Sequence, residues 1–217
     1  MRKILTAMAI VLAVSAVVLA ADKFVVDDGA KAQATCGGWW YTYNDASTGG
    51  NSEVVPAPQK FEKSGNSAVM KGKTGNKLGW DFIGLGVTLG EKAGCPGGAV
   101  PVDLSKYSTL SFKIKGAISG GRLIVNIPYT ESKCEEGKFG TKSLTDWADY
   151  EVSINQKLGK DWAVVKIDLR KDLKQPRWAK KIVTVEEVLK NAHNINWHFS
   201  SPDGDTIEIA IENVELN

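Results

Sequence analysis

Apolar and polar residues alternate along short segments of this chain, and glycine, proline, asparagine, aspartate and serine separate one segment from the next. Alternation with a period of two residues is typical of a strand that buries one face and exposes the other. Many such strands between turn residues predict an all-β fold, an antiparallel β-sandwich. Five segments carry the pattern, with the apolar rows Leu110, Phe112 and Ile114; Leu123, Val125 and Ile127; Tyr150, Val152 and Ile154; Val165, Ile167 and Leu169; and Ile207, Ile209 and Ile211.

Three other features of the sequence predict an irregular strand, a turn and a helix. Residues 78–89 change their apolar parity across Gly84, which predicts a bulge or bend at that position. The Gly120-Gly121 pair between two alternating segments predicts a hairpin. Residues 184–191 form the one expected helix, a short connector that begins with a threonine cap.

Residues 1–21 have the pattern of an export signal, because Arg2 and Lys3 precede an apolar run that ends in small residues. We expect cleavage after Ala20 or Ala21. The alternative is an uncleaved membrane anchor, since about 18 apolar residues are close to the minimum for spanning a bilayer. Both alternatives predict a protein that is secreted, periplasmic or at the cell surface, and cleavage leaves no membrane segment.

The remaining residues, 22–217, have a length that suits one sandwich domain, which we expect to act as a monomer. Two of the 27 basic residues lie in the leader, so the 25 that remain balance the 25 acidic residues. A neutral domain argues against nucleic acid as a partner, because nucleic-acid binding needs concentrated lysine and arginine. An uncharged ligand fits better.

The three cysteines, Cys36, Cys95 and Cys134, are expected to meet an oxidising compartment, where thiols pair. Their spacing does not fit a zinc cluster. A disulfide between Cys95 and Cys134 is preferred, because the predicted strand succession brings their loops to one edge. The pairings through Cys36 stay open, since connectivity does not follow from sequence.

Aromatic residues are the most informative local feature, because flat rings stack on the C–H faces of sugars and carry a polar tip. Four of them crowd into the segment of Trp39, Trp40, Tyr41 and Tyr43. One parity of this strand is expected to face the solvent and the other the core. The candidate ligand-binding residues are Trp40, Tyr43, Trp80 and the adjacent Asp81.

Polar residues extend this candidate site. Arg122 and Asn126 alternate with core residues, so they are expected to project from the outer face of a sheet. Asn194, Asn196 and His198 form a similar polar row that is able to hydrogen-bond sugar hydroxyls. An ordinary solvated sheet face would have the same pattern.

A structural calcium ion is a further expectation. Asp28, next to Asp27 in the first strand, and Glu212 in the last would meet if the terminal strands pair. Oxygen ligands from distant positions suit calcium, although the chain has no EF-hand loop.

Enzymatic motifs are absent from the sequence. There is no Gly-x-Ser-x-Gly elbow and no His-Glu-x-x-His, and Gly72-Lys73-Thr74 lacks the earlier glycine of a phosphate-binding loop. A glycoside hydrolase stays open, because it needs only two correctly spaced carboxylates.

The order of short motifs resembles the carbohydrate-binding modules of family 11 and related galactose-binding-like jelly rolls. The resemblance covers most of residues 24–217. It rests on VVDDG at 25–29, KSGNSAV at 63–69, VDLSKY at 102–107, LSFKIKG at 110–116, WAVVKIDL at 162–169 and IAIENVEL at 209–216.

This resemblance implies a concave sheet face that accepts one β-glucan chain, with calcium at its edge. The residues that it points to are Tyr43, Asp81, Arg122 and Tyr129. Glu212 stands where the family usually has aspartate, which is a departure at the calcium site.

The sequence therefore predicts non-catalytic binding of a polysaccharide, a β-glucan, by aromatic stacking and hydrogen bonds. Two alternatives remain, a glycoside hydrolase and an envelope adhesion or structural protein that binds no glycan.

Overall fold

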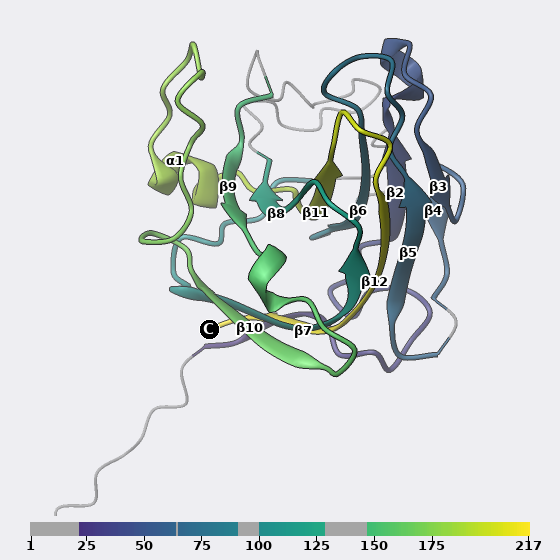
Figure 1. Cartoon of the computed structure of the whole chain (residues 1–217). Coiled ribbons are helices and arrows are strands. Elements are labelled where there is room, and N and C mark those ends of the chain that lie inside the picture. The colour runs from purple at the N-terminus through teal and green to yellow at the C-terminus, as the bar shows by residue number, and fades with distance from the viewer. Residues whose placement is uncertain (1–21, 64, 91–99, 129–146) are drawn as a thin grey trace, which may run out of the picture.

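Two antiparallel six-stranded sheets pack face to face in the computed structural model, which describes residues 22–63, 65–90, 100–128 and 147–217 (Figure 1). Sheet A has the order β10 (Ala163–Asp168), β7 (Thr109–Ile118), β12 (Thr206–Leu216), β5 (Ala68–Lys73) and β3 (Glu53–Val55), with β1 (Phe24–Asp27) paired to β12. Sheet B has the order β4 (Lys60–Phe61), β2 (Trp40–Asn44), β6 (Phe82–Thr88), β11 (Asn194–Ser200), β8 (Arg122–Ile127) and β9 (Tyr150–Ser153). The prediction of an antiparallel β-sandwich is confirmed.

Helical structure among the described residues is limited to α1 (Val185–Lys190) and the 3-10 turns η1 (Asp45–Thr48) and η2 (Asn155–Lys157). The expected helix is confirmed, and Thr184 and Glu187 form a capping box at its start. Within the described part of the chain, no helix has the length and apolar character needed to cross a membrane.

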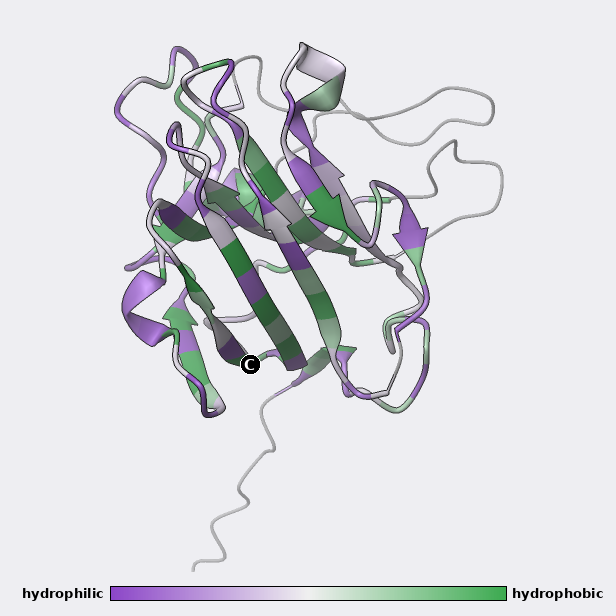
Figure 2. Ribbon diagram, turned by 45° about the vertical axis from the view of Figure 1, so that its right-hand side comes forward, coloured by the Kyte–Doolittle hydropathy of each residue, from purple (hydrophilic) through white to green (hydrophobic). Residues whose placement is uncertain are grey.

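The space between the sheets is filled by the inward face of each strand. Figure 2 shows the hydrophobic and hydrophilic bands that alternate along the strands. At the centre, the rings of Trp40 and Trp197 stack with centroids 5.6 Å apart, and Phe112 of sheet A meets Trp197 edge-on at 5.2 Å. Four of the five predicted apolar rows are buried, whereas Tyr150 and Val152 are half-buried because β9 is the edge of sheet B.

The predicted hairpin at Gly120-Gly121 is wrong. β7 pairs with β10 and β12 while β8 pairs with β11 and β9, so the Gly120-Gly121 turn carries the chain from sheet A to sheet B and closes no hairpin. No bulge occurs at Gly84, because β6 pairs in unbroken register with β2 and β11. Local alternation specifies a strand but not its partner.

The terminal strands pair as expected, with Phe24 opposite Leu216. Both strands are irregular, since the register shifts between Val25 and Asp27 and between Glu212 and Glu215. Cys95, Cys134 and the leader at residues 1–21 lie outside the described residues, and Cys36 is a free thiol.

We expect Trp40→Leu to lower the free energy of unfolding by about 3 kcal/mol, a typical cost for truncating a buried tryptophan. The substitution removes the stack on Trp197 and the hydrogen bond of 2.8 Å from Nε1 to Oδ2 of Asp27. Urea denaturation measures the difference. The matched control is Trp178→Leu, whose ring is 60% exposed and whose loss is expected to leave the midpoint almost unchanged.

Candidate functional site

Sheet B exposes an outer face on which aromatic and amide side chains gather. Because Trp40, Ile83 and Trp197 point into the core, their neighbours along β2, β6 and β11 point outward. The outer face of sheet B is made by Tyr41, Tyr43, Phe82, Gly84, Gly86, Arg122, Asn126, Glu151, Asn194, Asn196 and His198.

Two glycines of β6 allow the tyrosine rings to lie flat on this face. Tyr43 is paired with Gly84, and Tyr41 with Gly86. A Cβ atom on Gly84 would stand 2.0 Å from Cζ of Tyr43, and one on Gly86 would stand 2.4 Å from Cζ of Tyr41. Any larger residue would push the rings off the sheet, so the Gly-x-Gly pattern of β6 creates the flat surface.

Hydrogen bonds across β6 hold both rings in place. The Tyr41 hydroxyl donates to Oδ1 of Asn196 at 2.6 Å and accepts from Nδ2 of Asn194 at 2.7 Å. The Tyr43 hydroxyl lies 3.1 Å from Nδ1 of His198. Each phenol therefore spans β6 from β2 to β11, and its ring position is fixed at both ends.

Four rings form a continuous row on this face. Trp80 stacks on Phe82 with centroids 6.0 Å apart and an interplanar angle of 20°. Phe82 lies 6.1 Å from Tyr43, which lies 6.0 Å from Tyr41. Trp80 at one end is 54% exposed. Phe82, Tyr43 and Tyr41 are half-buried, so Trp80 offers the largest free ring surface of the row.

A polar row crosses the same face at right angles to the strands. Tyr41 is in register with Gly86, Asn196, Asn126 and Glu151 on successive strands. Asn126 and Asn194 each have a buried amide oxygen without a hydrogen-bond partner among the described residues. Both of these atoms are acceptors, so they fit a ligand that donates hydroxyl protons.

The charged pair on this face consists of Arg122 and Glu151. Nη2 of Arg122 lies 2.6 Å from Oε1 of Glu151, and their side chains are 51% and 17% exposed. The pair connects β8 to the edge strand β9.

Several sequence-predicted residues meet here. The structure brings Tyr43, Trp80, Arg122 and Asn126 to the outer face of sheet B or its rim. Tyr129 lies outside the described residues. Phe82 and Glu151 were not among the predicted residues, although the alternation of β6 and β9 would have placed them on the outer face.

Two predicted ligand residues are corrected. Trp40 is 0% exposed and belongs to the core, since it has the parity opposite to Tyr41 and Tyr43. Asp81 is also 0% exposed, and its carboxylate accepts the backbone N–H groups of residues 77, 78 and 79. Although burial raises the pKa of Asp81, these backbone donors bring it below its usual value. Asp81 shapes the loop that presents Trp80 and does not itself contact a ligand.

The residues expected at the calcium site have partners within the protein. Both oxygens of Asp27 contact Nζ of Lys63, at 2.7 and 2.5 Å, and the two side chains have no exposed surface. Asp28 instead accepts from Thr35, and Glu212 accepts from Ser67. No cluster of three or more His, Cys, Asp or Glu side chains able to hold a metal occurs among the described residues. The ammonium group of Lys63 supplies the cation beside Asp27.

We expect EDTA and added calcium to leave the melting temperature of the protein unchanged. Lys63→Met should lower the free energy of unfolding by about 3 kcal/mol, because it leaves a buried carboxylate without its partner. The double variant Asp27→Asn/Lys63→Met should recover part of that loss.

The control is Lys71→Met, whose partner Glu208 is 61% exposed and whose pair should contribute little. Differential scanning calorimetry provides the measurement. A fall in melting temperature on adding EDTA to the parent protein would show that a bound metal ion is needed.

The two histidines are held in their neutral form. Burial lowers the pKa of His198 to about 4, and the charge of Arg122 acts in the same direction. Burial also lowers the pKa of His193 to about 4. An unfolded histidine titrates near 6.5, so between pH 6.5 and 4 the unfolded chain binds more protons than the folded one.

Consequently the free energy of unfolding should decrease as the pH falls from 6.5 to 4, and should not depend on these groups above 6.5. Urea denaturation at pH 7.5, 6 and 5 measures the decrease. In His193→Gln/His198→Gln the decrease should be smaller. If the free energy of unfolding falls equally with pH in this variant and in the parent, other groups cause the decrease. NMR titration of the histidine ring protons in the folded parent would in that case give pKa values near 6.5.

Comparison with known proteins supports the fold and not a family assignment. No protein-family model matches the chain, and no curated protein matches it. Among solved structures, its fold is similar to carbohydrate-binding modules of the jelly-roll type.

Three such structures illustrate the similarity. The family 11 module of the cellulosomal cellulase Lic26A-Cel5E of Clostridium thermocellum is 16% identical, with a TM-score of 0.55 over 91% of this chain and 95% of that one. A family 11 module from Clostridium thermocellum, in complex with a β-1,3-1,4-mixed-linked tetrasaccharide, is 17% identical, with a TM-score of 0.52 over 91% and 96%. A family 30 module is 15% identical, with a TM-score of 0.53 over 90% and 98%.

Proposed function

We propose that the outer face of sheet B binds a polysaccharide chain, a β-glucan, without cleaving it. The observation that carries the proposal is the row of four rings from Trp80 to Tyr41, which lie flat on the sheet because β6 has glycine beneath the tyrosines. Sugar rings have apolar C–H faces, and each stack on an aromatic ring buries apolar area on both partners.

The polar groups beside the rings support the same ligand class. Asn126 and Asn194 have acceptor oxygens without partners among the described residues, and Arg122 and Glu151 lie at the edge of the face. A polyhydroxylated ligand both donates and accepts hydrogen bonds, so it would satisfy the amide oxygens that the protein leaves unpaired. The mixed-linked tetrasaccharide bound to the family 11 structure makes β-glucan the first class to test.

The proposal also includes the location of the domain outside the cell or at its surface. The basic and apolar leader at residues 1–21 supports secretion or exposure at the cell surface, where polysaccharides are found. There the domain would capture or adhere to a glycan.

Affinity electrophoresis against mixed-linkage β-glucan and hydroxyethyl-cellulose tests the proposal. We expect the parent protein to be retarded. Tyr43→Ala should weaken binding about tenfold, because it removes one stacking ring. Gly84→Ala should have a similar effect without removing any ring, since its methyl group displaces Tyr43.

The matched control is Trp162→Ala, which removes an aromatic ring that lies beneath the ammonium of Lys115 of sheet A. It should migrate like the parent. Unretarded migration of the parent on every neutral glucan would disprove the proposed ligand class, and release of reducing sugar would identify a glycoside hydrolase instead.

A further inference from the structure

Sheet B continues beyond its edge strand. Lys174 forms an isolated antiparallel bridge with Glu151 of β9, with backbone hydrogen bonds of 3.0 Å in both directions. Glu151 ends the polar row that crosses the outer face from Tyr41. Because paired residues share a face, Lys174 extends this row by one further position.

A cleft of about 380 Å³ begins at Lys174. Its walls come from β9, from the segment that follows β10 and from the start of α1. Three of its lining residues, Arg170, Lys174 and Arg177, are basic, and no lining residue is acidic. The other lining residues are Tyr150, Leu173, Gln175, Pro176, Ile182 and Val185.

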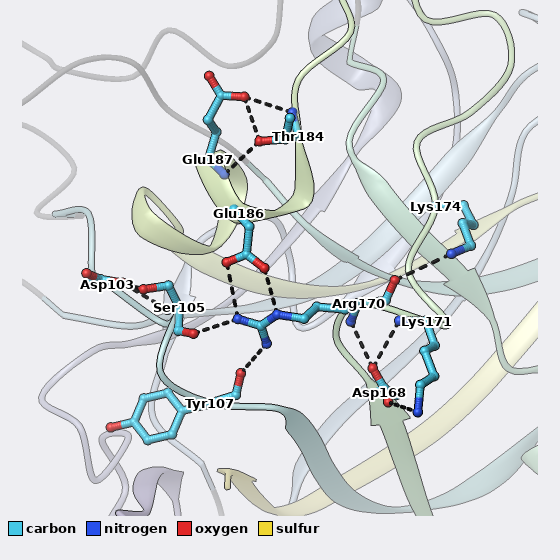
Figure 3. Close-up of polar contacts among 10 residues, drawn as sticks. All are labelled: Asp103, Ser105, Tyr107, Asp168, Arg170, Lys171, Lys174, Thr184, Glu186 and Glu187. Atoms are coloured by element: carbon cyan, nitrogen blue, oxygen red, sulfur yellow. Dashed lines mark hydrogen bonds and ion pairs between the residues drawn. The ribbon is translucent and has the colours of Figure 1, made fainter.

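Arg170 builds one wall of this cleft and is held rigidly (Figure 3). Its Nε donates to Oε1 of Glu186 at 2.6 Å, and its Nη1 and Nη2 donate to the backbone carbonyls of Tyr107 and Ser105 at 2.7 and 2.6 Å. Glu186 therefore neutralises the charge of Arg170. The wall is ordered but is not by itself a source of free positive charge.

Lys174 and Arg177 supply the uncompensated charge. Within the described part of the chain, the one hydrogen bond of the Lys174 Nζ is to the carbonyl oxygen of Arg170, at 3.4 Å (Figure 3). No carboxylate among the described residues forms an ion pair with either Lys174 or Arg177. Two cations that share a cleft without a counter-ion attract an anionic group.

The cleft differs in this respect from the larger one on sheet A. That cleft, of about 590 Å³, is lined by three lysines and by three acidic residues, Asp27, Asp28 and Glu215. Its charges are balanced, so it has no preference for an anion. Of these two clefts, the one beyond β9 has the net positive lining.

We propose that the cleft beyond β9 binds an anionic substituent, a carboxylate or a phosphate, of a polysaccharide whose neutral sugars lie on the outer face of sheet B. The inference rests on the proposed function of that face. A glycan that follows the polar row toward β9 reaches Lys174 directly. Arg177 lines the same cleft, and the next residue, Trp178, is 60% exposed and free to stack on a further sugar.

An anionic lipid surface is the competing partner, because Ile182 is 78% exposed beside the same cleft. Electrostatic attachment to a bilayer commonly uses clusters of about four to eight basic residues. Residues 170–181 include six basic residues. However, Arg170 pairs with Glu186, Lys171 pairs with Asp168, and Lys180 and Lys181 have interactions of their own. Lys174 and Arg177 remain, and two cations at the end of a polar row fit a single acidic substituent better.

The test compares polymers that share one backbone: hydroxyethyl-cellulose, carboxymethyl-cellulose and phosphorylated cellulose. We expect the full chain to bind the two anionic polymers about three- to tenfold more tightly than the neutral one. Raising the salt concentration should remove this difference and leave the neutral binding unchanged. Lys174→Gln/Arg177→Gln should lose the preference and retain the affinity for hydroxyethyl-cellulose.

The control is Lys113→Gln/Lys166→Gln, which removes the same net charge from sheet A and should retain the preference. If both double variants lose the preference for anionic polymers, the inference is overturned, because the preference then reflects the overall charge of the protein. Equal affinity of the parent for all three polymers would also overturn it. Failure of the parent protein to bind any of the polymers would contradict the proposed function itself. A different result would assign the cleft to a membrane: the parent binds vesicles with anionic lipids, Lys174→Gln/Arg177→Gln abolishes that binding and Lys113→Gln/Lys166→Gln does not, and polymer binding is the same in all three proteins.

Discussion

The stacking of Trp40 on Trp197 between the two sheets sets the orientation of everything on sheet B. Neighbouring side chains of a strand point to opposite faces, so an indole committed to the core at position 40 directs Tyr41 and Tyr43 outward. The same relation holds in β11, where the inward Trp197 directs Asn196 and His198 outward. The core packing and the candidate binding face are therefore two consequences of one strand register.

The strands and their parity could be read from the sequence, whereas their partners could not. The alternating rows at residues 110–114 and 207–211 indicated strands with one buried face, and the capped helix at 184–191 was visible from its threonine and glutamates. Pairing depends on contacts between residues far apart in the chain. For that reason the turn at Gly120-Gly121 was taken for a hairpin although it joins the two sheets.

The candidate site was partly predictable for a similar reason. Aromatic content and alternation led to Tyr43, Arg122 and Asn126, but single-residue chemistry did not distinguish a stacking ring from a core ring, as Trp40 shows. The buried pair of Lys63 and Asp27 was also invisible, because it joins residues 36 positions apart. The sequence pattern associates Asp27 with a calcium ion, whereas the structure places the ammonium group of Lys63 against it.

The hydrogen bonds that hold the tyrosine hydroxyls have an energetic consequence for recognition. Tyr41 is bonded to Asn194 and Asn196, and Tyr43 lies against His198, before any ligand arrives. Immobilising a side chain on association costs roughly 0.5–1.5 kcal/mol, and here folding has already met that entropy cost. Preorganised rings would thus allow this face to retain a flexible polymer with comparatively few contacts.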